Sequence, residues 1–341
     1  MLTLDLQFVE ALWPLVTRMA RAEPCPGELW SALEDQISLG PVLQNVHVDE
    51  EQGRALHLKE WRSVWETAAG IRRTPLIGGR RQEYALTNAR FSLQNAEALD
   101  VLIRHLTTRL ADITQRIVTI AVENLPSGAH CATEIHLVAG TASGGFTDET
   151  GVYVDMAVLG ALGANPKLTE QFLAHELWHS GHWSLIERHP RVDEPWFMPF
   201  AQLQSEGVVN FLIGGTYELY AHKALEGQED EKQRARRFLT YADSMDAEAF
   251  MRIDQLYSVI GSLLEGNEMA FQNFSNSLPD APGYLHGKYM AQIINSTLGR
   301  DALLATCSDP VTFLLEYARA CEHLGKKSPS ETVCDMLRNI S

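Results

Sequence analysis

Residues 174–179 read Ala174-His175-Glu176-Leu177-Trp178-His179, which is an HExxH motif. Two histidines four positions apart on a helix project from one face, so both imidazoles can reach the same metal ion. The glutamate between them then points toward the side of the ion that the protein leaves open. Asn165-Pro166 is a suitable helix start, because Asn is a preferred N-cap and Pro fits the first helical position. The stretch predicts a capped helix that carries a metal-binding pair of histidines.

A third protein ligand is expected downstream, because a catalytic zinc ion takes three protein ligands and keeps its fourth position for water. The metzincin pattern would need a histidine at the position that Leu185 occupies. Residues 200–211 predict a further helix, in which Glu206 is a lone carboxylate among largely uncharged residues. A buried carboxylate is unfavourable unless it is paired or bound to a metal. We therefore expect Glu206 to be the third ligand, with Gly207 letting another helix approach closely.

Other residues near the motif leave alternatives open. His182, three positions after His179, is expected near the ligands or on the surface rather than on the metal. If Glu206 does not bind, the acidic residues that could replace it are Glu187, Asp193, Glu194 and Glu218. The aromatic residues that either line a specificity pocket or belong to the core are Trp178, Trp183, Trp196 and Phe197.

The spacing of apolar residues predicts helices in some parts of the chain and strands in others. Apolar residues recur at steps of three and four from Asn95 to Ile120, which predicts a helix that ends before Pro126. Short apolar runs at 135–139 and 152–156, separated by glycines, predict strands of a small mixed or antiparallel sheet. The remaining expected elements are helices at 4–20 (interrupted near Pro14), 28–38 and 51–69, a hairpin turn at 141–145 and a solvated loop at 226–232.

These patterns predict an α+β protein that is mostly helical. A helical N-terminal region at 1–125 would precede a domain at 126–341. The expected parts of that domain are a small sheet at 130–160, metal helices at 166–215 and a helical subdomain at 216–341.

The composition excludes several classes of protein. Acidic residues outnumber basic ones by 44 to 28, and a net charge of −16 argues against binding to nucleic acid. Uncharged runs such as 135–147 are shorter than the ~20 residues that a membrane-spanning helix needs. The N-terminal segment carries Asp5 and Glu10 and has no basic residue before Arg18. It therefore lacks the basic start and the apolar stretch of a secretory signal. The five scattered cysteines form no C-x-x-C pair, so we expect reduced thiols in a cytoplasmic protein.

The motif His175-Glu176-x-x-His179, followed by Glu206-Gly207, resembles the gluzincin zinc metallopeptidases. With the segment Tyr284-Leu-His286-Gly287-Lys-Tyr289-Met290, the chain more closely resembles a group of bacterial proteins described as zinc-dependent peptidases. The similarity covers roughly residues 130–322. It implies a zincin-like core in which His175, His179 and Glu206 hold Zn²⁺.

The resemblance also implies a reaction, the hydrolysis of a peptide or protein substrate. Glu176 would act as general base, and the oxyanion would be stabilised by Tyr289, Tyr284 or His286. Zincin enzymes lay the substrate along an edge strand before the metal helix, a place that residues 152–156 occupy, unless they form an interior strand. Thermolysin-like gluzincins orient the first histidine with an Asp at the position that Asn210 occupies here.

Two other functions fit the same residues. One is a zinc hydrolase that acts on a different amide. The other is an interaction protein with a structural zinc site, which would be closed by a fourth protein ligand such as His182. The presence of Glu176 argues against the structural site, because such a site does not need a base.

Overall fold

The computed structural model describes residues 2–34, 36, 39–46, 54–71, 79–148, 150–226, 229–279, 282–326 and 329–341. The chain divides into two compact units: Met1–Thr119 with Ala132–Leu177, and Ile120–Cys131 with Trp178–Ser341. Most of the described residues are helical, and the described strands form one small mixed sheet. The predicted fold class is therefore confirmed. All five cysteines have free thiols, as expected.

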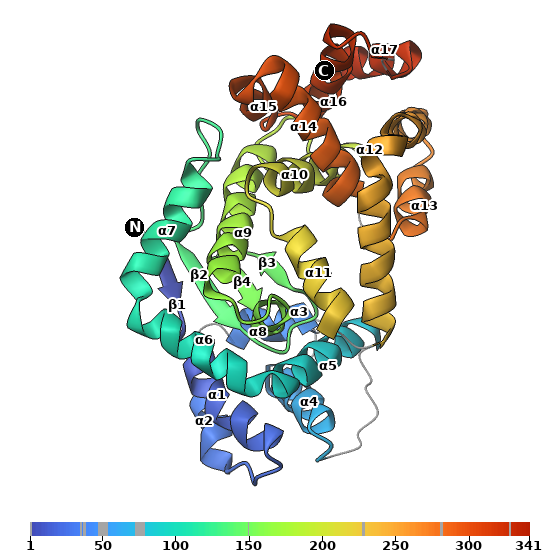
Figure 1. The fold of residues 1–341 in the computed structure, drawn as a ribbon. Helices are drawn as coiled ribbons and strands as arrows, with labels where there is room; N and C mark the ends of the chain where they lie inside the picture. Colours follow the sequence, from blue (N-terminus) through green and yellow to red (C-terminus); the bar gives the residue numbers. More distant parts are fainter. Residues whose placement is uncertain are drawn as a thin grey trace. The chain divides into compact units, whose positions relative to one another are not determined.

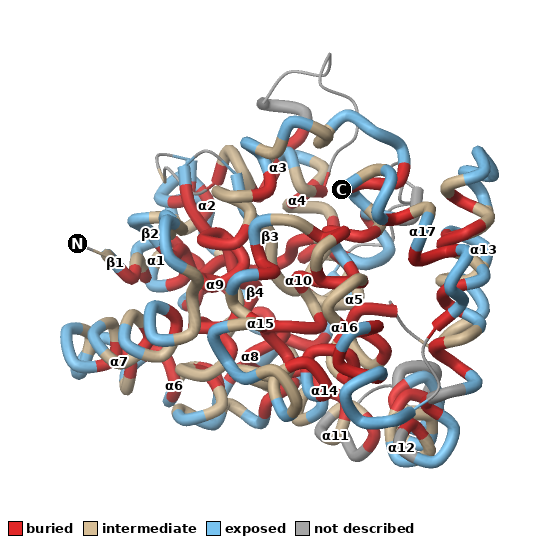
Figure 2. Tube along the Cα trace, turned by 90° about the horizontal axis from the view of Figure 1, so that it is seen from above, coloured by how far each residue is buried: buried red, intermediate tan, exposed pale blue. Residues whose placement is uncertain are grey.

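The sheet of the first unit has the order β1-β2-β4-β3 (Figure 1). Its strands are β1 (Thr3–Asp5), β2 (Glu134–Val138), β3 (Gly145–Thr147) and β4 (Val152–Asp155). β1, β2 and β4 run parallel, whereas β3 pairs antiparallel with β4. Figure 2 shows that β4 is buried. Within the described part of the chain, β4 is thus an interior strand and β3 is an edge strand.

The prediction of a hairpin turn at 141–145 is wrong. This segment joins β2 to β3, and those two strands are not neighbours in the sheet. The tight turn instead lies between β3 and β4, where the backbone N–H of Asp148 donates to the carbonyl of Gly151 over 3.0 Å. Asp148 Oδ1 also accepts the backbone N–H of Thr150 over 2.8 Å, as Asp side chains do in turns.

Helices of the first unit pack against this sheet, with α1 on β2 and α8 on β4. Among the helices, α5 packs against α8. Their bounds are α1 (Gln7–Ala20), α2 (Gly27–Glu34), α3 (Leu39–Val46), α4 (Arg54–Ala68), α5 (Gly79–Gln94), α6 (Ala96–Thr108), most of α7 (Leu110–Val122), α8 (Met156–Ala161) and the first part of α9 (Pro166–Ile186). Residues 35, 37–38 and 51–53 of the helices expected at 28–38 and 51–69 lie outside the described residues.

Two expectations for these helices are wrong. Helix α1 runs through Pro14 without interruption. The apolar pattern from Asn95 to Ile120 is divided between α6 and α7, with Arg109 between them. At the end of α6 the Thr108 hydroxyl donates to the carbonyls of Arg104 and His105, at 2.6 and 3.1 Å. The apolar positions continue on both sides of Arg109, so periodicity alone does not reveal the break.

The second unit is helical. Helix α10 lies against η1, α14 and α16, and α11 lies against α12. The bounds are α10 (Phe197–Leu212), α11 (Thr216–Glu226), α12 (Glu229–Leu264), α13 (Met269–Ser277), the π-helical turn η1 (Gly283–Gly287), α14 (Lys288–Leu298), α15 (Arg300–Thr306), α16 (Pro310–His323) and α17 (Glu331–Ile340).

The prediction of a solvated loop at 226–232 is also wrong, because α11 ends at Glu226 and residues 229–232 already belong to α12, which begins at Glu229. Residues 227–228 lie outside the described residues. Acidic residues are favoured in the first turn of a helix by the helix dipole, so an acidic stretch is a suitable helix start.

Candidate metal centre

Helix α9 carries the HExxH motif and begins as the sequence predicts. Asn165 Oδ1 accepts the backbone N–H groups of Lys167 and Leu168, at 2.9 and 3.3 Å. From Phe172 to His182 every residue is buried except Glu176, which is partly exposed. The helix therefore holds the two histidines in a dry environment and leaves the Glu176 carboxylate within reach of solvent.

Helix α10 supplies the third candidate ligand, as the lone carboxylate predicted. One ligand atom from each of His175, His179 and Glu206 lies within 4.8 Å of the other two. Among the described residues, this is the group of His, Cys, Asp and Glu side chains that could hold a metal ion. The acidic alternatives do not join it: Glu187, Asp193 and Glu194 are exposed, and Glu218 accepts the Gly215 N–H over 3.1 Å.

The geometry of the group suits zinc. His179 Nε2 and Glu206 Oε1 are 3.6 Å apart, which is too long for a hydrogen bond. Two ligands of a tetrahedral zinc ion, each about 2.1 Å from it, lie roughly 3.4 Å apart. Two imidazoles and a carboxylate are also the donor set of catalytic zinc sites. His179 and Glu206 are thus at about the spacing of ligands that share an ion, and a ligand atom of His175 lies within 4.8 Å of both.

Ser205 orients one of the histidines, and sequence reasoning missed it. Its hydroxyl lies 2.8 Å from His179 Nδ1 in a buried contact. A hydrogen bond at Nδ1 fixes the imidazole ring so that Nε2 faces the metal position. The signal in the sequence is faint, since Ser205 is one of several uncharged polar residues of this helix and is distinguished only by directly preceding Glu206.

Three glycines bring η1 into direct backbone contact with α10. A Cβ on Gly207 would lie 2.5 Å from the Cα of Gly287 and 2.6 Å from its carbonyl oxygen. A Cβ on Gly283 would lie 2.5 Å from the Cβ of Glu206. The predicted close approach at Gly207 is therefore confirmed, and it fixes the backbone that carries Glu206.

Glu176 lies against the edge strand β3. A Cβ on Gly145 would be 2.8 Å from the Glu176 carboxylate carbon and from Oε2. A larger residue at this point of the strand would therefore displace the carboxylate from its position. Sequence reasoning treated Gly145 as part of a turn and missed this contact.

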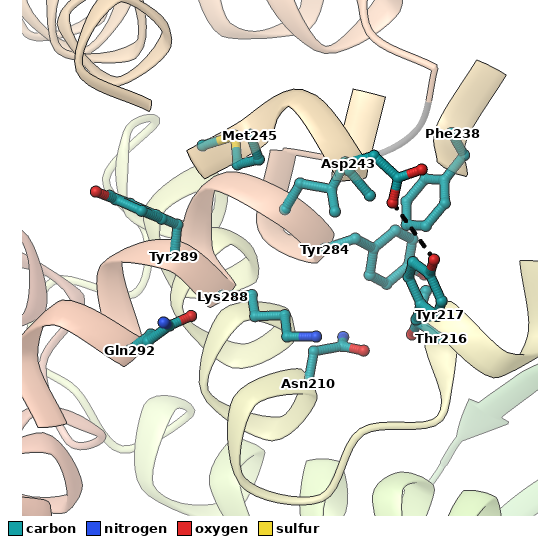
Figure 3. Close-up of a pocket in the computed structure, with 12 residues that line it drawn as sticks. Asn210, Thr216, Tyr217, Phe238, Asp243, Met245, Tyr284, Lys288, Tyr289 and Gln292 are labelled. Atoms are coloured by element: carbon teal, nitrogen blue, oxygen red, sulfur yellow. Dashed lines mark hydrogen bonds between the residues drawn. The ribbon is translucent and has the colours of Figure 1, made fainter. Parts of the chain in front are cut away.

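The residues of the Tyr284–Met290 segment occupy different surroundings. His286 is 1% exposed, and its Nε2 is 3.1 Å from the hydroxyl of Tyr241. Burial lowers the pKa of His286 to about 4. Tyr284 is partly buried and packs against a cluster that contains Tyr220 and Phe238. Tyr289 is buried, and Figure 3 shows its hydroxyl pointing away from Asn210.

Asn210 contacts the third candidate ligand itself. Its Nδ2 donates to the backbone carbonyl of Glu206 over 2.8 Å and lies 3.5 Å from Glu206 Oε2. The amide thus supports the carboxylate that the structure brings toward His179.

His182 is a core residue and not a surface one. It is fully buried, stacks on Trp178 with ring centroids 5.1 Å apart, and meets Gln204 Oε1 at 3.2 Å. Gln204 Nε2 in turn donates to the carbonyl of Thr306 over 2.6 Å. Burial lowers the pKa of His182 to about 3, so the ring is neutral. Trp178, Trp196 and Phe197 are likewise buried in the core, whereas Trp183 is partly exposed.

A protein-family comparison bears on this site. Residues 57–326 match the family described as "Putative zinc dependent peptidase (DUF5700)". The chain belongs to the DUF5700 family. The match contains the His175, His179 and Glu206 group as well as η1, so the chain has a group that could hold the metal ion that the family description names. Comparison with curated proteins and with solved structures found no match.

The DUF5700 match begins within α4 and ends after α16. Helices α1 to α3 and α17 therefore lie outside the matched range. Among the described helices of this family member, none is both long enough and apolar enough to cross a membrane.

Proposed function

We propose that this DUF5700 protein is a zinc peptidase of the gluzincin type, with His175, His179 and Glu206 as ligands. The observation that carries the proposal is the approach of the three ligand atoms to within 4.8 Å of one another. The position of His182, held against Gln204 and outside this group, supports a site with an open fourth position rather than a closed structural one.

The catalytic base of the proposed reaction is Glu176. A bound zinc ion supplies Lewis-acid chemistry, since it polarises a carbonyl and lowers the pKa of water toward about 7. Glu176 takes a proton from the water that attacks the peptide carbonyl carbon, so that a C–O bond forms. It then passes this proton to the leaving amine as the C–N bond breaks. Its partial exposure, in a helix that is otherwise buried there, supports this role.

The edge strand β3 is our candidate for holding the substrate backbone. An extended peptide can add to a strand edge through main-chain hydrogen bonds, which depend little on side chains. Gly145 places this edge directly beside the Glu176 carboxylate. A peptide bound along β3 would therefore run past the general base.

The oxyanion donor is proposed to be Tyr289, and because its hydroxyl points away from Asn210 in Figure 3, this role requires the side chain to turn toward the site. His286 is buried against Tyr241, and Tyr284 packs in an apolar cluster, so both have structural roles. Tyr289 follows η1, which contacts the backbone of α10 at Gly207. A phenol hydroxyl can stabilise the charge that develops on the carbonyl oxygen.

The test combines metal content with cleavage of a peptide library. We expect about one zinc ion per chain in protein purified without added zinc. Glu176→Gln should keep the zinc and lower the cleavage rate by about 100-fold or more. The exposed Glu322→Gln on α16 serves as the matched control. Absence of zinc, or full activity of Glu176→Gln, would refute the proposal, and zinc without cleavage of any peptide would favour a non-peptide amide.

A further inference from the structure

A pocket lies next to the third candidate ligand, within the second unit. Its volume is about 180 Å³, whereas pockets for whole small-molecule ligands measure about 300–1,000 Å³. The space therefore suits a single residue of a larger ligand. Helices α10, α12 and α14 and the turn η1 all contribute to it, as does the start of α11.

The pocket is connected to the metal centre through Asn210. This side chain lines the pocket and also lies 3.5 Å from Glu206 Oε2. A group bound beside Asn210 would therefore be one side chain away from the carboxylate that we propose as zinc ligand.

Lys288, the first residue of α14, brings a positive charge to this position. Figure 3 shows its side chain pointing toward Asn210. Within the described part of the chain, the Lys288 ammonium makes no ion pair and no hydrogen bond. It is partly buried, and a partly buried ammonium gains from an anionic partner. The chain has a net charge of −16, and yet this ammonium has no acidic partner within the described residues. A negatively charged ligand would supply that partner.

The remaining walls separate Lys288 from the acidic side chain of the pocket. Asp243 is exposed, and its Oδ1 lies 3.5 Å from the Tyr217 hydroxyl. In Figure 3, Tyr284 stands between Asp243 and the pair formed by Lys288 and Asn210. The aromatic and apolar side chains of Tyr284 and Met245 would exclude water from a bound carboxylate.

We propose that this pocket is a substrate subsite in which Lys288 binds a carboxylate of the peptide. The inference rests on the proposed peptidase function and adds a substrate class to it, peptides with an anionic residue near the cleaved bond. The carboxylate can come from an Asp or Glu side chain or from a free C-terminus. Both offer the same charge-assisted hydrogen bond to an ammonium group.

The experiment starts from one peptide that the wild-type zinc protein cleaves. Single positions on both sides of the cleaved bond are replaced by Asp, Asn, Glu, Gln or Leu, and each peptide is made with a C-terminal acid and a C-terminal amide. Values of kcat/KM are measured for the wild type, Lys288→Met and Lys288→Arg, with the exposed Lys167→Met as control. Zinc content and circular dichroism check that each variant is folded.

A binding measurement on the same peptides removes the dependence on turnover. Fluorescein-labelled peptides are titrated with zinc-loaded Glu176→Gln protein, with and without Lys288→Met, and the Kd is read from anisotropy.

Acidic peptides should be preferred over their amide counterparts by about tenfold or more, in kcat/KM and in Kd, which corresponds to 1.4 kcal/mol. Lys288→Met should remove this preference, and Lys288→Arg should keep most of it. A preference that follows the side chain identifies an internal acidic residue, and one that follows the terminus identifies a free C-terminus. Cleavage without any charge preference, or a preference that survives in Lys288→Met, overturns the subsite alone. Failure to cleave any peptide overturns the peptidase function and the subsite together.

Discussion

The contact between η1 and α10 leads to a prediction for Gly207→Ala. The added Cβ would lie 2.5 Å from the Cα of Gly287, whereas carbon atoms pack about 3.5 Å apart. The two backbones must therefore separate by roughly 1 Å, and the atoms that block the Cβ belong to the backbone and cannot rotate away. Overpacking of this kind costs about 3 kcal/mol, which lowers the Tm of a unit of this size by roughly 6–12 °C.

The same displacement should reach the metal centre, because Glu206 directly precedes Gly207. Metal–ligand distances hold to within about 0.2 Å, so a shift of roughly 1 Å should weaken zinc binding by about 10–100-fold. Zinc affinity is measured by competition with a chromogenic chelator, and Tm by calorimetry of the metal-free protein. Gly40→Ala is the control, because a Cβ on Gly40 meets nothing within 4 Å. If Gly207→Ala melts and binds zinc like the wild type, the backbone contact does not position Glu206.

Other residues of the site lead to three shorter predictions. Ser205→Ala should lower zinc affinity by about 10–100-fold, since His179 loses the bond that orients it, while the exposed Ser258→Ala should have no effect. His286 has a folded-state pKa of about 4, below its unfolded value of about 6.5, so the unfolded chain binds the extra proton and stability falls as the pH drops from about 6.5 toward 4. Urea unfolding across this range should show a smaller loss for His286→Gln; an unchanged loss would contradict this origin. Peptidase activity should survive in His286→Gln and fall in Tyr289→Phe.

Much of the candidate site follows from local sequence. The spacing of His175 and His179 fixes their common face, because one helical turn separates them whatever the rest of the chain does. Glu206 and Gly207 were predicted from burial and close approach, which are also properties of a short segment. Ser205 and Gly145 were not, since their roles depend on which side chain of another element lies opposite, and a single sequence does not state this.

The fold shows the same limit. The Asn165-Pro166 start located α9, a largely uncharged run located α10, and short apolar runs located the two longer strands, β2 and β4. Apolar periodicity did not separate α6 from α7, since the apolar positions continue on both sides of Arg109. The order of the strands in the sheet could not be predicted from the sequence either. Strand β3 has only three residues, and its place at the edge is set by pairing with β4 rather than by its own pattern.

The segment Tyr284–Met290 acquires a physical meaning from these contacts. Its glycines are required where η1 meets α10, since a Cβ on Gly283 would strike Glu206 and one on Gly287 would strike the carbonyl of Leu203. The residues that follow the glycines are thereby held at a fixed distance from the metal helices. Lys288 and Tyr289 come directly after this contact, so the packing that fixes Glu206 also fixes the two side chains that we propose act on the substrate. A single close contact between helices would then serve metal binding and substrate binding together.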